Sequence, residues 1–426
     1  MKRLLIISPY FPPTNTPDIH RVRMSLPYFK QYGWEAEVVI VDPIYSDLLQ
    51  DELLVDTVPT DIKIHRVKAF NKATVSKFGV GNIAYRSYIF YKKKVGELLR
   101  DKKFDLIYFS TTQFAVCTLG AYWKKRFGVP YVIDMQDPWH SEYYQDKPKH
   151  QQPPKYWLSY RLNKYLEPIA LTKADGLISV SDSYITDLKI RYPEIKDIPA
   201  ATITFGSFKP DFDIAKKNKD KFPNLLDSGF KNIVYIGRGG MDMHKAITPV
   251  FNALKKGLEA NPLVFEQIRF HFIGTSYAPD GEGQTTLLPL AEQLGIADSV
   301  IETTNRISYY HTLATLQQAD ALFIPGSDDP KYTASKIYPY LMVKKPLLTI
   351  FNSKSPAMNV LNACIVPHAY SYDATTDLEN KLLNFLTQLV NGTMADPVYD
   401  EDALDQYSAM NMAKKQCALF DLAILK

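Results

Sequence analysis

Three stretches of this 426-residue sequence combine residue types that can hold a phosphate group or a sugar. The first is VYIGRGGMDMHKAI, in which Gly237, Gly239 and Gly240 surround Arg238, and Lys245 follows near an expected helix start. Glycines allow a close backbone approach to a ligand, and the cations supply the opposite charge, so this pattern is typical of a phosphate-binding turn. A flexible turn with solvated charges is the alternative interpretation.

The second stretch is ASKIYPYL, where Ser335 and Lys336 stand before Pro339. Proline lacks an N–H and its ring clashes with the carbonyl four residues back, so we expect the helix to begin right after Ser335. The amides of Lys336, Ile337 and Tyr338 then lack intrahelical acceptors, which favours an anion site at the helix N-terminus. An ordinary capped helix with an early proline is the alternative.

The third stretch is YVIDMQDPWHSEYY, where a buried strand ends in polar and aromatic residues. Polar chemistry in α/β proteins gathers at the carboxyl ends of strands. Asp134, Asp137 and His140 are therefore our candidate catalytic residues. Asp137 stands before a proline, and an ordinary turn residue is the alternative for it.

The loop after the first strand, ISPYFPPTNTPDIHRVRM, has no glycine where a dinucleotide fold places GxGxxG, so a hydride-transfer enzyme is not expected. It offers Thr14, Asn15, Thr16 and Arg21 instead, and Asp18 is the expected N-cap of the helix that follows. We read it either as a loop that faces hydroxyl or phosphate groups or as a solvated polar loop.

Arg306 is a further candidate, because it follows the strand SVIETT and precedes an amphipathic helix. It is either a cation that faces the ligand or a surface arginine.

Short, nearly continuous apolar strands alternate with helical patterns along the whole chain, which predicts parallel sheets covered on both faces. We expect an α/β protein with two tandem Rossmann-like doubly wound domains and a cleft between them. Residues 1–206 form the first domain, a charge-rich linker covers 207–230, and residues 231–398 form the second. Residues 399–426 form a C-terminal helix that returns to the first domain.

The composition excludes several classes of protein. A net charge of +4 is too small for a dedicated nucleic-acid binder. The three cysteines lie far apart, which argues against disulfides or a zinc site and fits a reducing cytoplasm. The apolar run LLII near the start is too short for a secretion signal, and no run approaches the ~20 residues of a membrane span. We expect a cytoplasmic protein that is soluble or peripheral to the inner face of the membrane.

Two segments of the first domain mix basic and aromatic residues. Residues 84–103 contain seven basic and two acidic residues, a net charge of +5, and residues 153–171 interleave lysine and arginine with tryptophan and tyrosine. Basic amphipathic helices with aromatics suit an anionic membrane surface, and hence a lipid-linked acceptor. Sheet-covering helices with a solvated basic face are the alternative.

Taken together and in order, these segments resemble the family 4-type glycosyltransferases of GT-B fold. The resemblance runs nearly end to end through the quoted segments and through FDLIYFS, KKRFGVPYVIDMQDPW, KADGLISVSDSYITDL, QQADALFIPGSDDPKYTASKIYPYL and KKPLL. It implies a metal-independent, retaining transfer of a sugar from a nucleotide-diphosphate sugar to a hydroxyl of a glycan or lipid-linked acceptor. Surface polysaccharide or glycolipid assembly is the setting that it suggests, with no cofactor and no nucleic acid as partner.

The resemblance also implies roles for single residues. Arg238 matches the arginine that binds the donor diphosphate, Lys245 is a candidate for its partnering lysine, and Ser335 and Lys336 match the start of the donor-binding helix. Asp137 lies at or beside a position where many members carry a histidine near the sugar.

Two departures affect the donor site. Pro339 stands where the family has the glutamate that grips the ribose, and Lys331 stands eight residues earlier in place of its partner. Asp328, Asp329 and Tyr338 are then candidates to hold the ribose. A non-catalytic scaffold with a degenerate donor site, and an epimerase or hydrolase on the same fold, stay open as alternatives.

Overall fold

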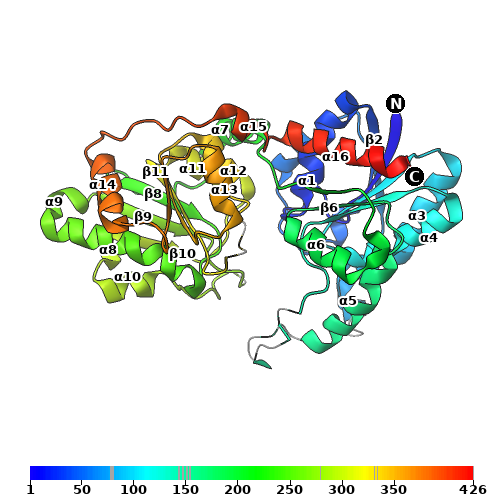
Figure 1. The fold of residues 1–426 in the computed structure, drawn as a ribbon, viewed down its shortest axis with the longest axis horizontal. Coiled ribbons are helices and arrows are strands. Elements are labelled where there is room, and N and C mark those ends of the chain that lie inside the picture. Colours follow the sequence, from blue (N-terminus) through cyan, green and yellow to red (C-terminus); the bar gives the residue numbers. More distant parts are fainter. Residues whose placement is uncertain are drawn as a thin grey trace. The chain divides into compact units, whose positions relative to one another are not determined.

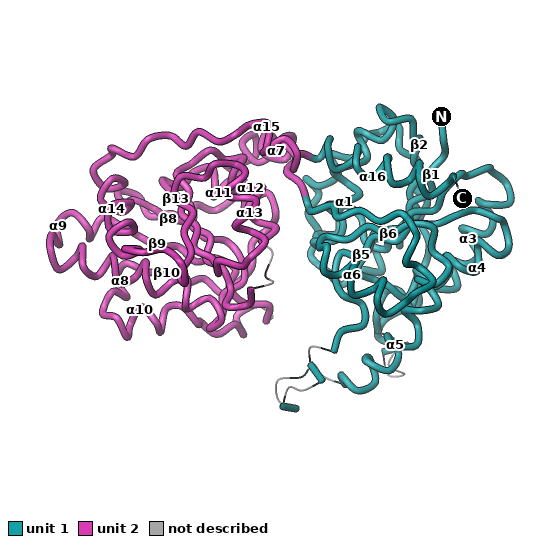
Figure 2. The backbone as a smooth tube through the Cα atoms, viewed as in Figure 1, with its two compact units in different colours: residues 1–205, 409–426 teal, residues 206–408 magenta. Residues whose placement is uncertain are grey.

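Two α/β units make up the protein (Figures 1 and 2). The computed structural model describes residues 1–76, 81–142, 144–145, 148–149, 152, 155–278, 280–330, 332 and 334–425. Unit 1 comprises residues 1–205 and 409–426, and unit 2 comprises residues 206–408. Lys331 of the sequence analysis lies outside the described residues.

Unit 1 contains a parallel sheet of seven described strands in the order β3-β2-β1-β4-β5-β6-β7. The strands are β1 (Lys2–Ile7), β2 (Trp34–Val41), β3 (Lys63–Val67), β4 (Leu106–Ser110), β5 (Tyr131–Met135), β6 (Gly176–Ser179) and β7 (Ala200–Thr202). The helices are α1 (Ile19–Ser25), α2 (Lys72–Val75), α3 (Ile83–Asp101), α4 (Thr118–Phe127), α5 (Tyr156–Leu171), α6 (Asp182–Arg191) and α16 (Ala409–Ile424).

Helices cover both faces of this sheet, as continuous apolar strands require. Leu5 and Ile7 of β1 pack in one core cluster with residues of α3 and α4. On the other face, the ring of Phe420 in α16 lies 4.9 Å from that of Tyr108 in β4 and 5.6 Å from that of Trp34 in β2, between ring centroids. The last helix of the chain thus completes the core of the first unit, as its colour in Figure 2 shows.

Unit 2 contains a parallel sheet of six described strands in the order β10-β9-β8-β11-β12-β13. The strands are β8 (Lys231–Ile236), β9 (Ile268–Ile273), β10 (Val300–Thr303), β11 (Ala321–Pro325), β12 (Leu347–Phe351) and β13 (His368–Ser371). The helices are α7 (Lys209–Lys217), α8 (His244–Ala260), α9 (Pro262–Phe265), α10 (Leu288–Leu294), α11 (Tyr309–Gln318), α12 (Ile337–Val343), α13 (Pro356–Ala363), α14 (Leu378–Val390) and α15 (Glu401–Asp405).

The stretch 207–230 is not the linker that its charge suggested. It contains α7, whose Phe212 and Ala215 are buried, and the carboxylate of Asp211 accepts hydrogen bonds from Tyr309 and Tyr310 of α11, both at 2.9 Å. The charges cover the outer side of an amphipathic helix, and composition alone does not distinguish such a helix from a linker.

The returning helix begins later than expected. Residues 399–408, including α15, belong to unit 2, and the segment that packs on unit 1 starts at Ala409. In the described part of the chain, every helix is too short or too polar to span a bilayer.

Candidate functional site

A group of cations lies at the carboxyl end of β8 in unit 2. Lys336, just before α12, extends its side chain over the turn after β8, where its Nζ donates to the Tyr235 hydroxyl at 3.2 Å. Gly237 leaves the room for it, since a Cβ at that position would lie 1.6 Å from Nζ, and its φ of 150° is one that other residues rarely adopt. The backbone of the first turn therefore accommodates the lysine that the later segment supplies.

Lys336 lies in an electrostatically unfavourable place. Burial, and then the neighbouring guanidinium groups of Arg306 and Arg238, lower the pKa of its ammonium group to about 7. Among the described residues no carboxylate pairs with Lys336. An anion placed among the three cations would stabilise the charged lysine.

Arg238 is held by a carboxylate that the sequence analysis missed. Its Nη1 and Nη2 donate to the two oxygens of Asp242 at 2.9 and 2.6 Å, and the Ser327 hydroxyl donates to the same carboxylate at 2.8 Å. These hydrogen bonds lower the pKa of Asp242 and raise that of Arg238. The i, i+4 spacing of the two residues was the available signal, and the pair fixes the direction of the guanidinium.

The two glycines beside Arg238 keep this turn tight. A Cβ on Gly239 would lie 2.9 Å from that of Thr275, and a Cβ on Gly240 would lie 2.4 Å from an Asp242 oxygen. A side chain at either position would push the Arg238 turn away from its partners.

The third cation comes from the loop after β10. The guanidinium of Arg306 is exposed and lies 4.8 Å from the centroid of the exposed Tyr277 ring. A Cβ on Gly274, just after β9, would lie 3.5 Å from the Cα of Arg306, so this loop lies at the carboxyl end of the strand next to β8. The Arg306 charge helps to lower the pKa of Lys336. Lys245 is exposed on α8 and has no contact with this group among the described residues.

The start of α12 differs from the expected anion site. The helix begins at Ile337, so Lys336 and not Ser335 occupies the cap position, and no side chain caps it. The Ile337 amide already donates to the Ala334 carbonyl at 3.1 Å, because residues 334–336 form a turn of their own. Pro339 falls in the first helical turn, where its missing N–H has no intrahelical acceptor to lose.

Two of the ribose candidates, Tyr338 and Asp328, have different surroundings. Tyr338 is buried and its ring stacks on that of Tyr407 at 4.8 Å, so its packing role competes with a ribose contact. Asp328 is exposed, and its amide donates to the Asp242 carbonyl at 2.8 Å, which keeps it beside the Arg238 turn.

Asp134 in unit 1 lies in the core and is paired with Arg21. It is fully buried, and its Oδ2 accepts from Arg21 Nε at 2.9 Å and from Ser110 at 2.9 Å. Arg21 also donates to the carbonyls of Ile203 and Thr204 at 2.6 and 3.0 Å. Arg21 therefore faces the core and is not available as a ligand in the first loop.

His140 is also directed inward. Its ring is buried, packs on the Tyr160 ring at 4.8 Å between centroids, and burial lowers its pKa. Neither ring nitrogen has a hydrogen-bond partner in the described part of the chain. A neutral histidine that packs on α5 does not form a pair with Asp137.

The remaining unit 1 candidates divide between the core and a cavity. Thr14 is buried and bridges to Gln50, and the Asn15 amide donates to the Leu49 carbonyl at 2.8 Å, so both brace the loop. Thr16 and Asp137 line a cavity of about 520 Å³ at the carboxyl edge of the sheet.

Asp137 keeps access to solvent in this cavity. Desolvation, and then the carboxylate of Asp18, raise its pKa above the ordinary value. No group of three or more His, Cys, Asp and Glu side chains within the described residues is arranged to hold a metal ion.

We compared the protein with known families, sequences and structures. No protein-family model and no curated protein matches the chain. A UDP-forming trehalose-phosphate synthase from Burkholderia xenovorans is 13% identical with a TM-score of 0.54, covering 99% of this chain and 97% of its own. WaaG, a glycosyltransferase involved in lipopolysaccharide biosynthesis, is 12% identical with a TM-score of 0.54, covering 98% of this chain and 99% of its own.

An E. coli structure described as trehalose-6-phosphate bound with UDP-2-fluoro glucose is 11% identical with a TM-score of 0.55, and covers 99% of each chain. At such identities the likeness concerns the fold, which these proteins share over nearly their whole length. The protein therefore has the GT-B fold of two Rossmann-like units.

Proposed function

We propose that this protein is a glycosyltransferase that moves a sugar from a nucleotide-diphosphate sugar to an acceptor hydroxyl. The observation that carries the proposal is the cation group of Lys336, Arg238 and Arg306 at the carboxyl end of β8, where ligands bind in open α/β sheets. The fold, which it shares with nucleotide-sugar glycosyltransferases, supports the proposal.

The charges of this group suit a diphosphate. Three cations and the Asp242 carboxylate leave a surplus of two positive charges, which matches the charge of about −2 on a diphosphate diester. As the bond to the sugar breaks, negative charge grows on the leaving phosphate, and fixed cations stabilise it without reorganisation. Leaving-group stabilisation is therefore the proposed role of the three residues.

Asp137 is the group in unit 1 that we propose to orient the sugar or the acceptor. Its carboxylate is exposed, whereas the exposed Asp47 of the same cavity pairs with Lys72. Asp134 lies in the core and is paired with Arg21. We also propose that the transfer retains the configuration of the sugar, as in the family that the sequence resembles. Such a transfer needs no strong general base, so the buried, paired Asp134 is not required to act as one. Asp328, beside the Arg238 turn, is our candidate for the ribose contact.

A thermal-shift screen with UDP, GDP, ADP and CMP, each against its unphosphorylated nucleoside, tests the function. One nucleotide is expected to raise the melting temperature of the protein and its nucleoside is not, because the cations bind the phosphates. If all of these ligands leave the melting temperature unchanged, the donor site is not functional and a scaffold role is favoured.

Binding of the nucleotide sugar is expected to take up protons near neutral pH. Free Lys336 has a pKa of about 7 and is mostly deprotonated at pH 7.5, whereas the bound diphosphate favours its charged form. We expect a net uptake of protons at pH 7.5, and an affinity that is full below pH 7 and falls as the pH rises above it.

Calorimetry in HEPES and in Tris measures this uptake, because the two buffers release protons with different enthalpies. A nucleotide sugar is the ligand to use, since its diphosphate diester does not titrate in this range. An observed enthalpy that is the same in both buffers would contradict the role of Lys336.

We further propose that α5 attaches the protein to an anionic membrane surface, such as the inner face of a cell membrane, and that the acceptor is lipid-linked. Trp157 and Tyr165 are 62% and 69% exposed, and Leu158, Leu162 and Ile169 are also exposed. At 100° per residue these side chains form one apolar stripe on the helix. Lys155, Arg161 and Lys164 lie within or beside it. Residues 84–103, the other basic segment, do not share this feature, because their helix α3 packs its apolar side on the sheet.

Trp157→Ala/Tyr165→Ala is expected to weaken binding to vesicles of phosphatidylglycerol and phosphatidylcholine by about tenfold, since it removes the largest apolar side chains of the stripe. Flotation measures the bound fraction, and Ile190→Ala, which shortens an exposed apolar side chain of α6, is the matched control. If the wild type does not float with anionic vesicles at low salt, the α5 surface has another role.

A further inference from the structure

The cavity of unit 1 lies where its sheet changes direction. In the strand order β3-β2-β1-β4-β5, the strands β2 and β3 lie on one side of β1, and β4 and β5 lie on its other side. The order therefore reverses between β1 and β4. Ligands of open α/β sheets bind outside the carboxyl ends of the strands at such a switch point. The cavity opens there, between the segments that follow β1, β2, β3, β4 and β5.

Groups able to bind hydroxyls line this cavity of about 520 Å³. Carboxylates accept hydrogen bonds from hydroxyls, and amide and hydroxyl side chains both donate and accept. The polar lining residues are Tyr10, Thr16, Asp18, Asp47, Asn82, Thr112, Gln113 and Asp137, together with Lys72 and Arg86.

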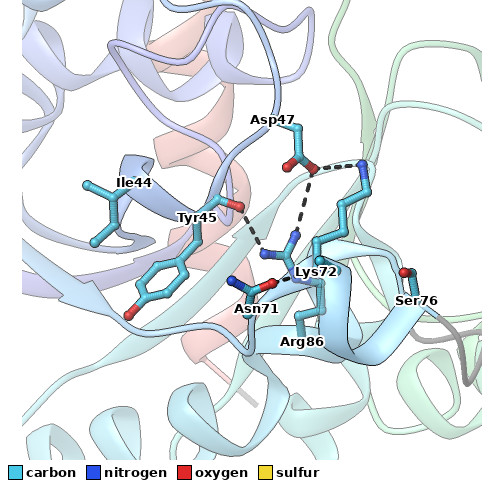
Figure 3. A pocket seen from close by; sticks show the side chains of 8 residues that line it. Ile44, Tyr45, Asp47, Asn71, Lys72, Ser76 and Arg86 are labelled. Atoms are coloured by element: carbon cyan, nitrogen blue, oxygen red, sulfur yellow. Dashed lines mark hydrogen bonds and ion pairs between the residues drawn. The ribbon is translucent and has the colours of Figure 1, made fainter.

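The two cations of the lining are already engaged. Asp47 lies 2.8 Å from the Lys72 Nζ and 3.9 Å from the Arg86 Nη1. Figure 3 shows these three residues in a neighbouring pocket that they also line. Arg86 is nearly buried and also donates to the carbonyls of Phe70 and Tyr45 at 2.8 and 3.1 Å. Asp47 offsets one of the two positive charges, and the lining as a whole, with Asp18 and Asp137, holds three carboxylates against two cations.

The other end of the cavity is negative. Asp18 accepts from Thr16 and from the Thr112 amide and hydroxyl, at 3.3 and 3.2 Å for the latter two. The Asp137 carboxylate has no hydrogen bond with the described residues, and it lies near enough to Asp18 for the two to repel each other. A ligand that donates hydrogen bonds would relieve this repulsion, whereas an anion would increase it.

We infer that this cavity binds the acceptor through an uncharged sugar whose hydroxyls donate to Asp137, and that it discriminates against sugar phosphates. The inference rests on the proposed glycosyl transfer and names the acceptor class for it. Discrimination follows from the lining, because its three carboxylates outnumber its two cations, and both cations contact Asp47.

Saturation-transfer NMR on the full-length protein tests this with methyl glycosides of glucose, mannose, galactose and N-acetylglucosamine, and with glucose 6-phosphate. The nucleotide that the thermal-shift screen identifies is present in excess to keep probes out of the donor site. At least one uncharged glycoside is expected to give a signal that glucose 6-phosphate does not. Asp137→Ala is expected to weaken that binding about fivefold or more, since a charge-assisted hydrogen bond is lost. Asp187→Ala, which removes an exposed carboxylate of α6, is the control.

Charge reversal provides a second variant. Asp137→Lys is expected to shift the preference toward glucose 6-phosphate, which a merely destabilised cavity would not do. The inference is wrong if no uncharged glycoside binds, if Asp137→Ala leaves the signal unchanged, or if glucose 6-phosphate binds the wild type and Lys72→Ala abolishes it. Each of these results is independent of nucleotide binding in unit 2, which the thermal-shift screen reports separately.

Discussion

Replacing Lys336 with methionine is expected to weaken the binding of a nucleoside diphosphate by about 10- to 100-fold, the effect of losing a charge-assisted hydrogen bond in a partly buried site. Methionine keeps most of the length of the side chain, so the contact with the Tyr235 ring, 4.9 Å from Nζ in the wild type, is largely preserved. Only the charge and its hydrogen bonds are removed. Titration calorimetry with UDP, GDP, ADP and CDP measures the change.

The same variant is not expected to unfold the protein. The pKa of Lys336 is lowered in the folded state, so the charged form is disfavoured there, and its removal keeps or raises the melting temperature of the free protein. Lys255→Met, which changes an exposed lysine of α8, is the control for loss of net charge. Equal affinities in the Lys336 and Lys255 variants would mean that the diphosphate binds elsewhere.

The donor site shows what the sequence could predict. Proline chemistry predicted that a helix starts beside Lys336, and the structure starts it one residue later than expected, at Ile337. The choice of this residue depended on the preceding turn, in which the Ile337 amide finds the Ala334 carbonyl. Residue types do not predict this hydrogen bond, since any backbone carbonyl can accept one.

The tertiary partners of charged residues could not be predicted. Asp134 and Asp137 stand three positions apart in one polar segment, yet the first is fully buried and the second lines a cavity. Strand alternation does not resolve this, because β5 is buried on both faces and the loop begins within three residues of Asp134. Asp134 is the carboxylate that pairs with Arg21, which is distant in the sequence.

The unit 1 cavity was missed because its lining comes from separate loops. Asp47, Lys72 and Arg86 follow different strands or open different helices, and none belongs to a motif. Parallel topology brings these loops to one edge of the sheet. Which loops meet there depends on the strand order, and the residue types do not determine that order.

Arg21→Met is expected to destabilise unit 1 by about 3–5 kcal/mol, because it leaves the Asp134 carboxylate buried and unpaired. The carbonyls of Ile203 and Thr204 lose their donors in the same variant, which adds to the effect. The melting transition of unit 1, followed by calorimetry, measures the loss. Asp137→Asn, in an accessible carboxylate of the same segment, is expected to leave that transition within about 0.5 kcal/mol of the wild type.

A double variant separates the buried charge from the rest of the effect. Arg21→Met/Asp134→Leu removes both charges, and replacing a buried ion pair by apolar side chains is often nearly neutral. We therefore expect the double variant to be more stable than Arg21→Met alone, although the carbonyls of Ile203 and Thr204 still lack a donor. If Arg21→Met is as stable as the wild type, Asp134 does not depend on this arginine and regains its place among the candidate catalytic groups.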